Sequence, residues 1–95
     1  MKNYTALIID LKRFRAYSVE DRKSIQNYVI IVIEELNKVF TNSLARDDEF
    51  SGVDEVQGLF LTTEDSYFYF RMFYMLISPV EIRAGIGVGE WNVKI

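Results

Sequence analysis

The chain of 95 residues contains no cysteine, no histidine and a single proline. Without cysteine it forms neither disulfides nor thiolate metal sites, and without histidine it has no imidazole to act as a ligand or a general base. A metal bound here would therefore be a hard cation such as Mg²⁺, Mn²⁺ or Ca²⁺, held by oxygen atoms. The sequence also lacks a long apolar run, which argues against a signal peptide or membrane span and predicts a cytoplasmic protein.

The length and composition predict one domain, residues 1–95, with a single modest core, since 49% of the residues are hydrophobic. The charge is divided unevenly along the chain. Residues 1–46 carry eight Lys or Arg and five Asp or Glu, a net charge of +3, whereas residues 47–95 carry three and nine, a net charge of −6. The acidic total argues against a nucleic-acid partner, because nucleic-acid binders usually present a basic stripe.

The first half of the chain predicts a strand followed by a helix. The apolar run from Ala6 to Ile9 is typical of a central strand, and Asp10 ends it. Ser18 with Asp21 three residues later resembles a capping box, so a helix should begin near Val19; we expect it to end near Asn42. One apolar stripe at three- and four-residue spacing runs along this helix: Ile25, Tyr28, Val29, Val32, Ile33, Leu36, Val39 and Phe40.

A β-hairpin is predicted over residues 50–61, with Asp54 and Glu55 at its tip. Gly58 in the second arm marks either a bulge or a place where another group approaches the backbone closely. After the hairpin, residues 63–66 provide a helix N-cap, and residues 67–77 form an aromatic helix that is apolar on nearly every side. Such a helix implies a partner, either a second copy of the chain or a polypeptide segment that this chain lacks. The proposed interface residues are Phe68, Phe70, Phe73, Tyr74 and Ile77.

The last strand should cover residues 81–89, with Ile82, Ile86 and Val88 on one face and Arg83 with three glycines on the other. The element order is then strand, helix, strand, strand, helix, strand. This order predicts an α+β, ferredoxin-like βαββαβ fold, in which an antiparallel sheet carries two helices on one face and the first and third strands are adjacent.

The predicted topology brings carboxylates from two strands together. Asp10 at the end of the first strand should lie beside Asp54 and Glu55 at the start of the third, where the carboxylates could share a divalent cation. Three basic residues follow Asp10 directly, and they are either a solvated loop or phosphate-binding residues: Lys12, Arg13 and Arg15.

Four parts of the sequence stand out as motifs: Ile9-Asp10-Leu11, Asp21-Arg22 with Gln26 and Asn37, Asp54-Glu55-Val56-Gln57-Gly58-Leu59, and Arg83-Ala84-Gly85-Ile86-Gly87-Val88-Gly89-Glu90. Together they resemble the SatD family. Members of that family resemble the palm domain of nucleotidyl cyclases and GGDEF diguanylate cyclases. The resemblance implies that Asp10 and Asp54, with Glu55 beside them, hold Mg²⁺ or Mn²⁺ on a nucleoside triphosphate.

Two departures from the family pattern leave a second hypothesis open. Val53 stands where the GGDEF signature has its second glycine, and the chain is shorter than the full family unit. The first hypothesis is therefore a metal-dependent nucleotide-binding or nucleotidyl-transfer domain. The alternative is a non-catalytic, oligomerising interaction domain with a degenerate site, in which Asp10 and Asp54 are solvated turn residues.

Overall fold

The computed structural model describes residues 3–51 and 54–90, and it has the predicted α+β order. Val53, at the predicted hairpin tip, lies outside the described residues. In chain order the elements are β1 (Asn3–Leu11), a short 3-10 helix η1 (Phe14–Ala16), α1 (Val19–Val39), β2 (Leu44–Ser51), β3 (Glu55–Phe60), α2 (Thr63–Ile77) and β4 (Ile82–Glu90).

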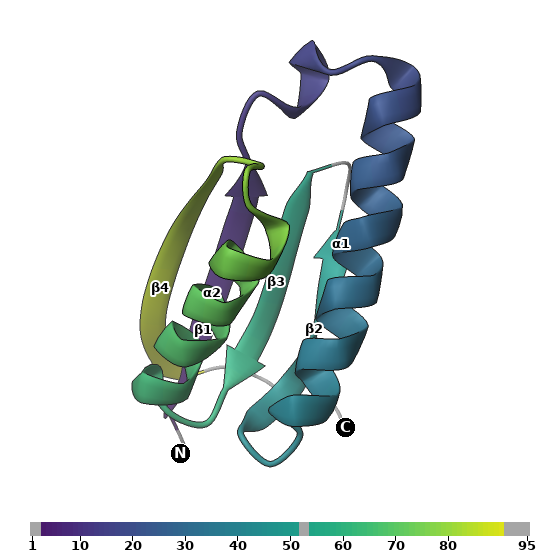
Figure 1. Cartoon of the computed structure of the whole chain (residues 1–95). Helices are drawn as coiled ribbons and strands as arrows, with labels where there is room; N and C mark the ends of the chain where they lie inside the picture. Colours follow the sequence, from purple (N-terminus) through teal and green to yellow (C-terminus); the bar gives the residue numbers. More distant parts are fainter. Residues whose placement is uncertain (1–2, 52–53, 91–95) are drawn as a thin grey trace.

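The four strands form one antiparallel sheet in the order β2-β3-β1-β4, so the first and third strands are central and adjacent as predicted. Figure 1 shows both helices on the same face of this sheet, with α1 over the β2 side and α2 over β1 and β4. This arrangement confirms the ferredoxin-like βαββαβ fold. No helix in the described part of the chain is long and apolar enough to cross a membrane.

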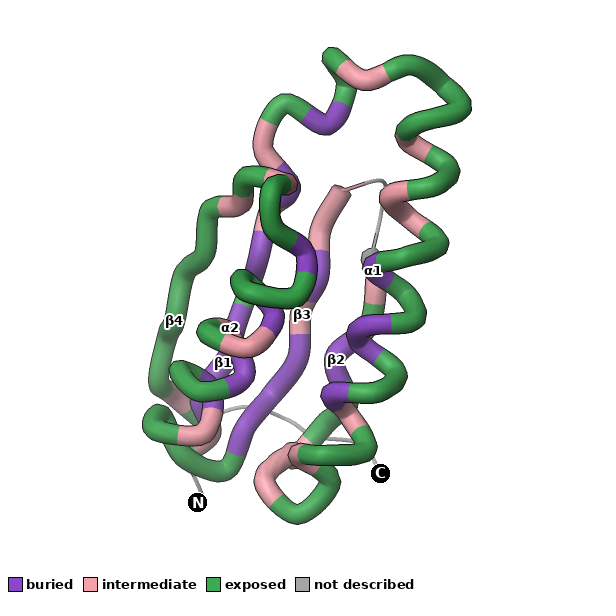
Figure 2. Tube along the Cα trace, in the orientation of Figure 1, coloured by how far each residue is buried: buried purple, intermediate pink, exposed green. Residues whose placement is uncertain are grey.

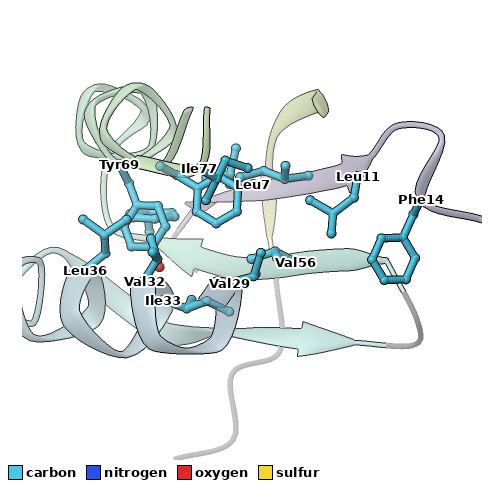
Figure 3. Close-up of a cluster of buried hydrophobic side chains, with 13 residues drawn as sticks. Leu7, Leu11, Phe14, Val29, Val32, Ile33, Leu36, Val56, Tyr69 and Ile77 are labelled. Atoms are coloured by element: carbon cyan, nitrogen blue, oxygen red, sulfur yellow. The ribbon is translucent and has the colours of Figure 1, made fainter. Parts of the chain in front are cut away.

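The core lies between the helices and the sheet. On β1 the residues Leu7, Ile9 and Leu11 point toward the helices and are buried, because alternate side chains of a strand share a face. They pack with the inner stripes of the two helices and with β3, as Figure 3 shows. The predicted stripe of α1 is largely confirmed, with two exceptions. Tyr28 is exposed and its hydroxyl donates to the Leu76 carbonyl, and Val39 is exposed at the end of the helix, which comes three residues earlier than expected.

Side-chain hydroxyls cap both helices. The Ser18 hydroxyl accepts a hydrogen bond from the Asp21 amide at 3.1 Å, which confirms Ser18 as the N-cap and the start of the helix at Val19. At α2 the N-cap is Thr62, one residue before the predicted segment, and its hydroxyl accepts from the Asp65 amide at 3.2 Å. Acidic residues occupy both first turns, where the helix dipole stabilises negative charge.

The interface predicted on α2 requires a correction. Phe73 and Ile77 lie in the core of the single chain, together with Tyr69, because residues four apart on α2 share the face that packs on the sheet. They are therefore unavailable to a partner. Phe70 is half-buried, whereas Phe68 and Tyr74 are 53% and 52% exposed. The sequence pattern predicted too much exposed apolar surface on α2, because the sheet and α1 together cover more than one stripe of the helix.

Candidate functional site

Asp10 lies at the end of the central strand β1, between neighbours of opposite charge. Its directly opposed residue on β3 is Glu55, and its opposed residue on β4 is Arg83. Opposed residues of antiparallel strands share a face, with Cβ atoms about 5 Å apart. Since Ile9 and Leu11 point toward the helices, this row of charges lies on the opposite, helix-free face. The predicted proximity of Asp10 to the Asp54-Glu55 pair is confirmed.

Two backbone hydrogen bonds fasten the neighbouring segments beside Asp10. The Leu11 amide donates to the Asp54 carbonyl at 2.8 Å, and the Lys12 amide donates to the Glu81 carbonyl at 2.8 Å. Both bonds continue the β ladders one step beyond the strand ends. The turn before β3 and the start of β4 are thereby held on either side of the Asp10–Lys12 segment.

The basic loop after β1 is held in place by one aromatic anchor. The side chain of Phe14 is buried beside Leu11 at the end of the core, while Arg13 and Arg15 on either side of it are exposed (Figure 3). Arg13 has a φ of 55°, a left-handed conformation that costs free energy for a residue with a side chain. The loop therefore directs two guanidinium groups outward from a fixed backbone.

A cleft of about 320 Å³ collects these charged residues at the end of β1, near the lower limit of ligand-binding pockets. Four cationic and two acidic side chains line it, a local net charge of +2 in a protein whose total is −3. Lys12, Arg13 and Arg15 face the cleft as predicted, together with Asp10 and Asp54; the remaining lining residues are Leu11, Phe14 and Arg83. Glu55 adjoins Asp10 in the sheet but is outside the lining.

The acidic side chains of the cleft are too few to hold a metal ion by themselves. Within the described residues no three acidic side chains gather closely enough to do so. Asp10 and Asp54 can supply two oxygen ligands, and phosphate oxygens and water would complete the coordination, which is the usual mode of Mg²⁺. The donor set therefore fits a cation that arrives with a phosphate ligand.

Comparison of the chain with protein-family models, curated proteins and solved structures gives no match. We treat the resemblance to the SatD family as a proposal. Arg83, a member of its last motif, is the one cationic residue of the cleft that the sequence prediction did not assign to phosphate binding.

A second polar cluster lies around Asp48 of β2, a residue to which the sequence analysis assigned no role. The Asp48 side chain is only 4% exposed, and neither carboxylate oxygen has a hydrogen-bond partner among the described residues. Burial, together with the charge of Asp47, raises the pKa of the Asp48 carboxyl to about 8. Asp48 is therefore protonated at neutral pH.

The backbone of Asp48 is held by a side chain of α1. The Asn37 amide group donates to the Asp48 carbonyl at 2.8 Å, and its Oδ1 accepts from the Asp48 amide at 3.2 Å. The same Oδ1 accepts from the Tyr69 hydroxyl at 3.0 Å. The β2–β3 register shifts on both sides of Arg46, so Asn37 replaces the strand partner that Asp48 lacks.

Gly58 of β3 makes room for the Asp48 side chain. A Cβ atom at this position would lie 2.6 Å from the Asp48 Cγ and 2.9 Å from the Asp48 Cα, distances that no side chain tolerates. Of the two alternatives predicted for Gly58, close approach of another group is therefore confirmed. The pKa of the Tyr69 hydroxyl is also raised, first by burial and then by the charges of Asp48 and Asp47.

Proposed function

We propose that the cleft at the end of β1 binds a nucleoside triphosphate together with Mg²⁺ or Mn²⁺. The observation that carries this proposal is the convergence of two carboxylates and four cations, from three separate segments, on one cleft. Polyphosphates are bound in proteins by such mixtures, in which cationic side chains contact phosphate oxygens and carboxylates contact a bridging cation.

Asp10 and Asp54 are the proposed cation ligands, and Glu55 supports them from the adjacent strand position. Without a cation, Asp10 and Glu55 are like charges directly opposed across two strands, which is unfavourable by up to about 1 kcal/mol. A bound cation removes this repulsion. Arg13 and Arg15 are free of the core and well placed to contact phosphate oxygens, and Lys12 and Arg83 line the same cleft.

The resemblance to the SatD family extends the proposal from binding to nucleotidyl transfer. A divalent cation held by Asp10 and Asp54 would supply charge neutralisation at a leaving pyrophosphate. The protein's own contribution would be to orient the phosphates with Arg13, Arg15 and Lys12.

A thermal-shift titration tests the binding proposal. We expect ATP or GTP to stabilise the protein only when Mg²⁺ or Mn²⁺ is also present, by about 2.7 kcal/mol at 100 times the dissociation constant. The variant Asp10→Asn/Asp54→Asn should lose this effect and keep its stability to within about 1 kcal/mol, because the repulsion removed at Glu55 offsets the attraction lost at Arg83. Glu34→Gln, an exposed acid on α1, is the matched control and should keep the shift. Absence of a shift with every nucleotide and cation pair would refute the proposal.

Arg13→Gly provides a separate test of the phosphate contact. Glycine adopts a positive φ without strain, so this variant should be as stable as the parent, within about 1 kcal/mol. Loss of one guanidinium contact should weaken nucleotide binding about 10-fold, as measured by isothermal titration calorimetry. Arg46→Gly, an exposed arginine on β2 outside the cleft, should leave the affinity unchanged.

A second candidate function is assembly of the domain with copies of itself. It is supported by the exposed aromatic residues Tyr67, Phe68 and Tyr74, which lie outside the core on the solvent side of α2. Contiguous apolar surface of this kind commonly marks a protein–protein contact. Nucleotide binding and assembly use different surfaces, so the two are independent.

A further inference from the structure

β4 is an edge strand that the rest of the described chain, residues 3–51 and 54–81, leaves uncovered. It pairs with β1 on one side only, and that register runs without a break from Asn3 opposite Glu90 to Leu11 opposite Ile82. Figure 2 shows β4 exposed along nearly its whole length, in contrast to β1 and β3. The strand contains no proline and no bulge, two of the usual devices that prevent an edge from pairing with another chain.

The opposite edge of the sheet, β2, is protected. Its register with β3 shifts twice, and it carries three exposed charged residues: Arg46, Asp47 and Glu49. Bulges and charges at an edge discourage further strand pairing. The two edges therefore differ, and of these two described edge strands β4 is the one suited to receive a strand.

The backbone groups at the free edge can be assigned from one hydrogen bond. The Lys12 amide donates to the Glu81 carbonyl, and these residues are opposed in the continued β1–β4 register. In an antiparallel ladder, hydrogen-bonded pairs alternate with pairs that are not bonded, so Arg83, Gly85, Gly87 and Gly89 bond to β1. The amides and carbonyls of the alternate residues point outward: Ile82, Ala84, Ile86, Val88 and Glu90.

The same outward residues carry the side chains that face the helix layer. Ile86 and Val88 are 41% and 63% exposed, because α2 covers only the inner part of β4. Tyr74 of α2 and Ile82 at the start of β4 line one cleft, and Tyr67, two helical turns earlier, lies on the same side of the helix as Tyr74. An apolar strip, Tyr67, Tyr74, Ile86 and Val88, thus lies between α2 and the free edge.

We propose that β4 pairs antiparallel with the β4 strand of a second copy, about a two-fold axis that passes through Ile86. Ile86 is the central residue of Ile82–Glu90, so this register pairs the complete strand: Ile86 with Ile86, Ala84 with Val88 and Ile82 with Glu90. Every outward-pointing residue then meets another outward-pointing residue, and each such pair exchanges two hydrogen bonds. The result is one continuous sheet across two copies, with all four helices on the same face.

The symmetry of the strand favours a second copy as the occupant. The outward-pointing residues lie symmetrically about Ile86, so an identical strand matches every one of them. The two α2 helices would lie two to three strand spacings apart, about 10–14 Å. The apolar strips of the two copies would fill the gap between them. Three glycines on the helix-free face leave no side chain to obstruct the pairing.

The size of this contact is sufficient for a stable but moderate dimer. The strand of nine residues is about 30 Å long, and the sheet and helix layers together are about 20 Å thick. Each copy would therefore bury on the order of 600 Å². The sum over both copies, about 1,200 Å², is near the lower limit of stable interfaces. The proposal rests on assembly between copies and does not depend on the nucleotide cleft.

The absence of cysteine allows a direct cross-linking test. In Ile86→Cys the two thiols of a dimer would lie at a hydrogen-bonded pair with Cα atoms about 5.5 Å apart, within the range of a disulfide. Mild oxidation should convert most of this variant to a covalent dimer. Ile31→Cys, a similarly exposed position on α1, is the matched control and should cross-link at least 10-fold more slowly. Equal rates for the two variants would overturn the proposal.

Sedimentation of two variants at one position separates edge pairing from other contacts. Val88→Pro removes an outward amide and no bond to β1, whereas Val88→Ala keeps the amide and shortens the side chain. The wild type should be dimeric at 100 µM, Val88→Ala should remain so, and Val88→Pro should be monomeric with the helix content of the wild type. A folded, dimeric Val88→Pro would refute strand pairing while leaving assembly intact. A monomeric wild type would refute both strand pairing and self-assembly. The free edge of β4 would then be available to a different protein. If Val88→Pro does not fold, the Ile86→Cys cross-link decides.

Discussion

Gly58→Ala should lower the free energy of unfolding by about 3 kcal/mol, the largest effect expected for a change of one methyl group in this protein. The added Cβ would lie 2.6 Å from the Asp48 Cγ and 2.9 Å from the Asp48 Cα, so both the side chain and the β2 backbone must move. That movement would also disturb the hydrogen bonds from Asn37 to Asp48. Urea denaturation followed by circular dichroism measures the loss.

Gly87→Ala is the matched control. A Cβ on Gly87 would meet no heavy atom within 4 Å among the described residues, so its unfolding free energy should change by less than about 1 kcal/mol. The double variant Gly58→Ala/Asp48→Ala should recover about half of the loss, since it removes the clash with the carboxyl group and keeps the one with the Cα. If Gly58→Ala and Gly87→Ala prove equally stable, Asp48 does not occupy the space above Gly58.

The stability of the wild-type protein should fall as the pH rises from 5 to 8. In the unfolded chain Asp48 has released its proton by pH 5, whereas in the folded protein its pKa is raised to about 8, because the carboxyl group is buried beside Asp47. Between these values the folded state binds more protons, so its stability decreases with pH by up to about 1.4 kcal/mol per unit. The stabilisation from protonated Asp48 is fully present at a pH below the pKa of Asp48 in the unfolded chain. It is lost as the pH rises through the pKa of Asp48 in the folded protein.

Asp48→Asn should abolish this slope, because the amide has nearly the same shape and carries no charge at any pH. Urea titrations at pH 5, 6.5 and 8 would show the two proteins converging at low pH and diverging at high pH, where the variant is the more stable. Asp47→Asn, at the neighbouring exposed position, should retain most of the slope, as should Tyr69→Phe, which removes the nearest titratable hydroxyl. Parallel pH profiles for wild type and Asp48→Asn would show that Asp48 is ionised in the folded state.

The cluster around Asp48 has a structural consequence for the candidate site. Asn37 joins α1 to the edge strand β2, and Gly58 lies on β3, the strand that begins at Asp54 and Glu55. The position of β3 relative to β1 sets the distance from Asp54 to Asp10. The structure thus gives Asn37 and Gly58 a packing role outside the cleft.

Much of the fold could be predicted because local patterns specify it. The apolar run ending at Asp10, the capping box of Ser18 and the three- and four-residue spacing on α1 are properties of neighbouring residues, and they give element type and order directly. The order in turn restricts the sheet topology to few choices, which is why Asp10 was correctly expected beside Glu55.

The sequence alone determined the element order, the ferredoxin-like topology and the group of charged residues at the end of β1. The tertiary structure alone decided which residues are hidden: Phe73 and Ile77 became core, while Asp48 became a buried acid above Gly58. The physical reason is the range of the forces involved. Periodicity and capping act between residues three or four apart, whereas burial depends on contacts such as Asn37 with Asp48 and Asp48 with Gly58, which link three different elements and leave no local pattern.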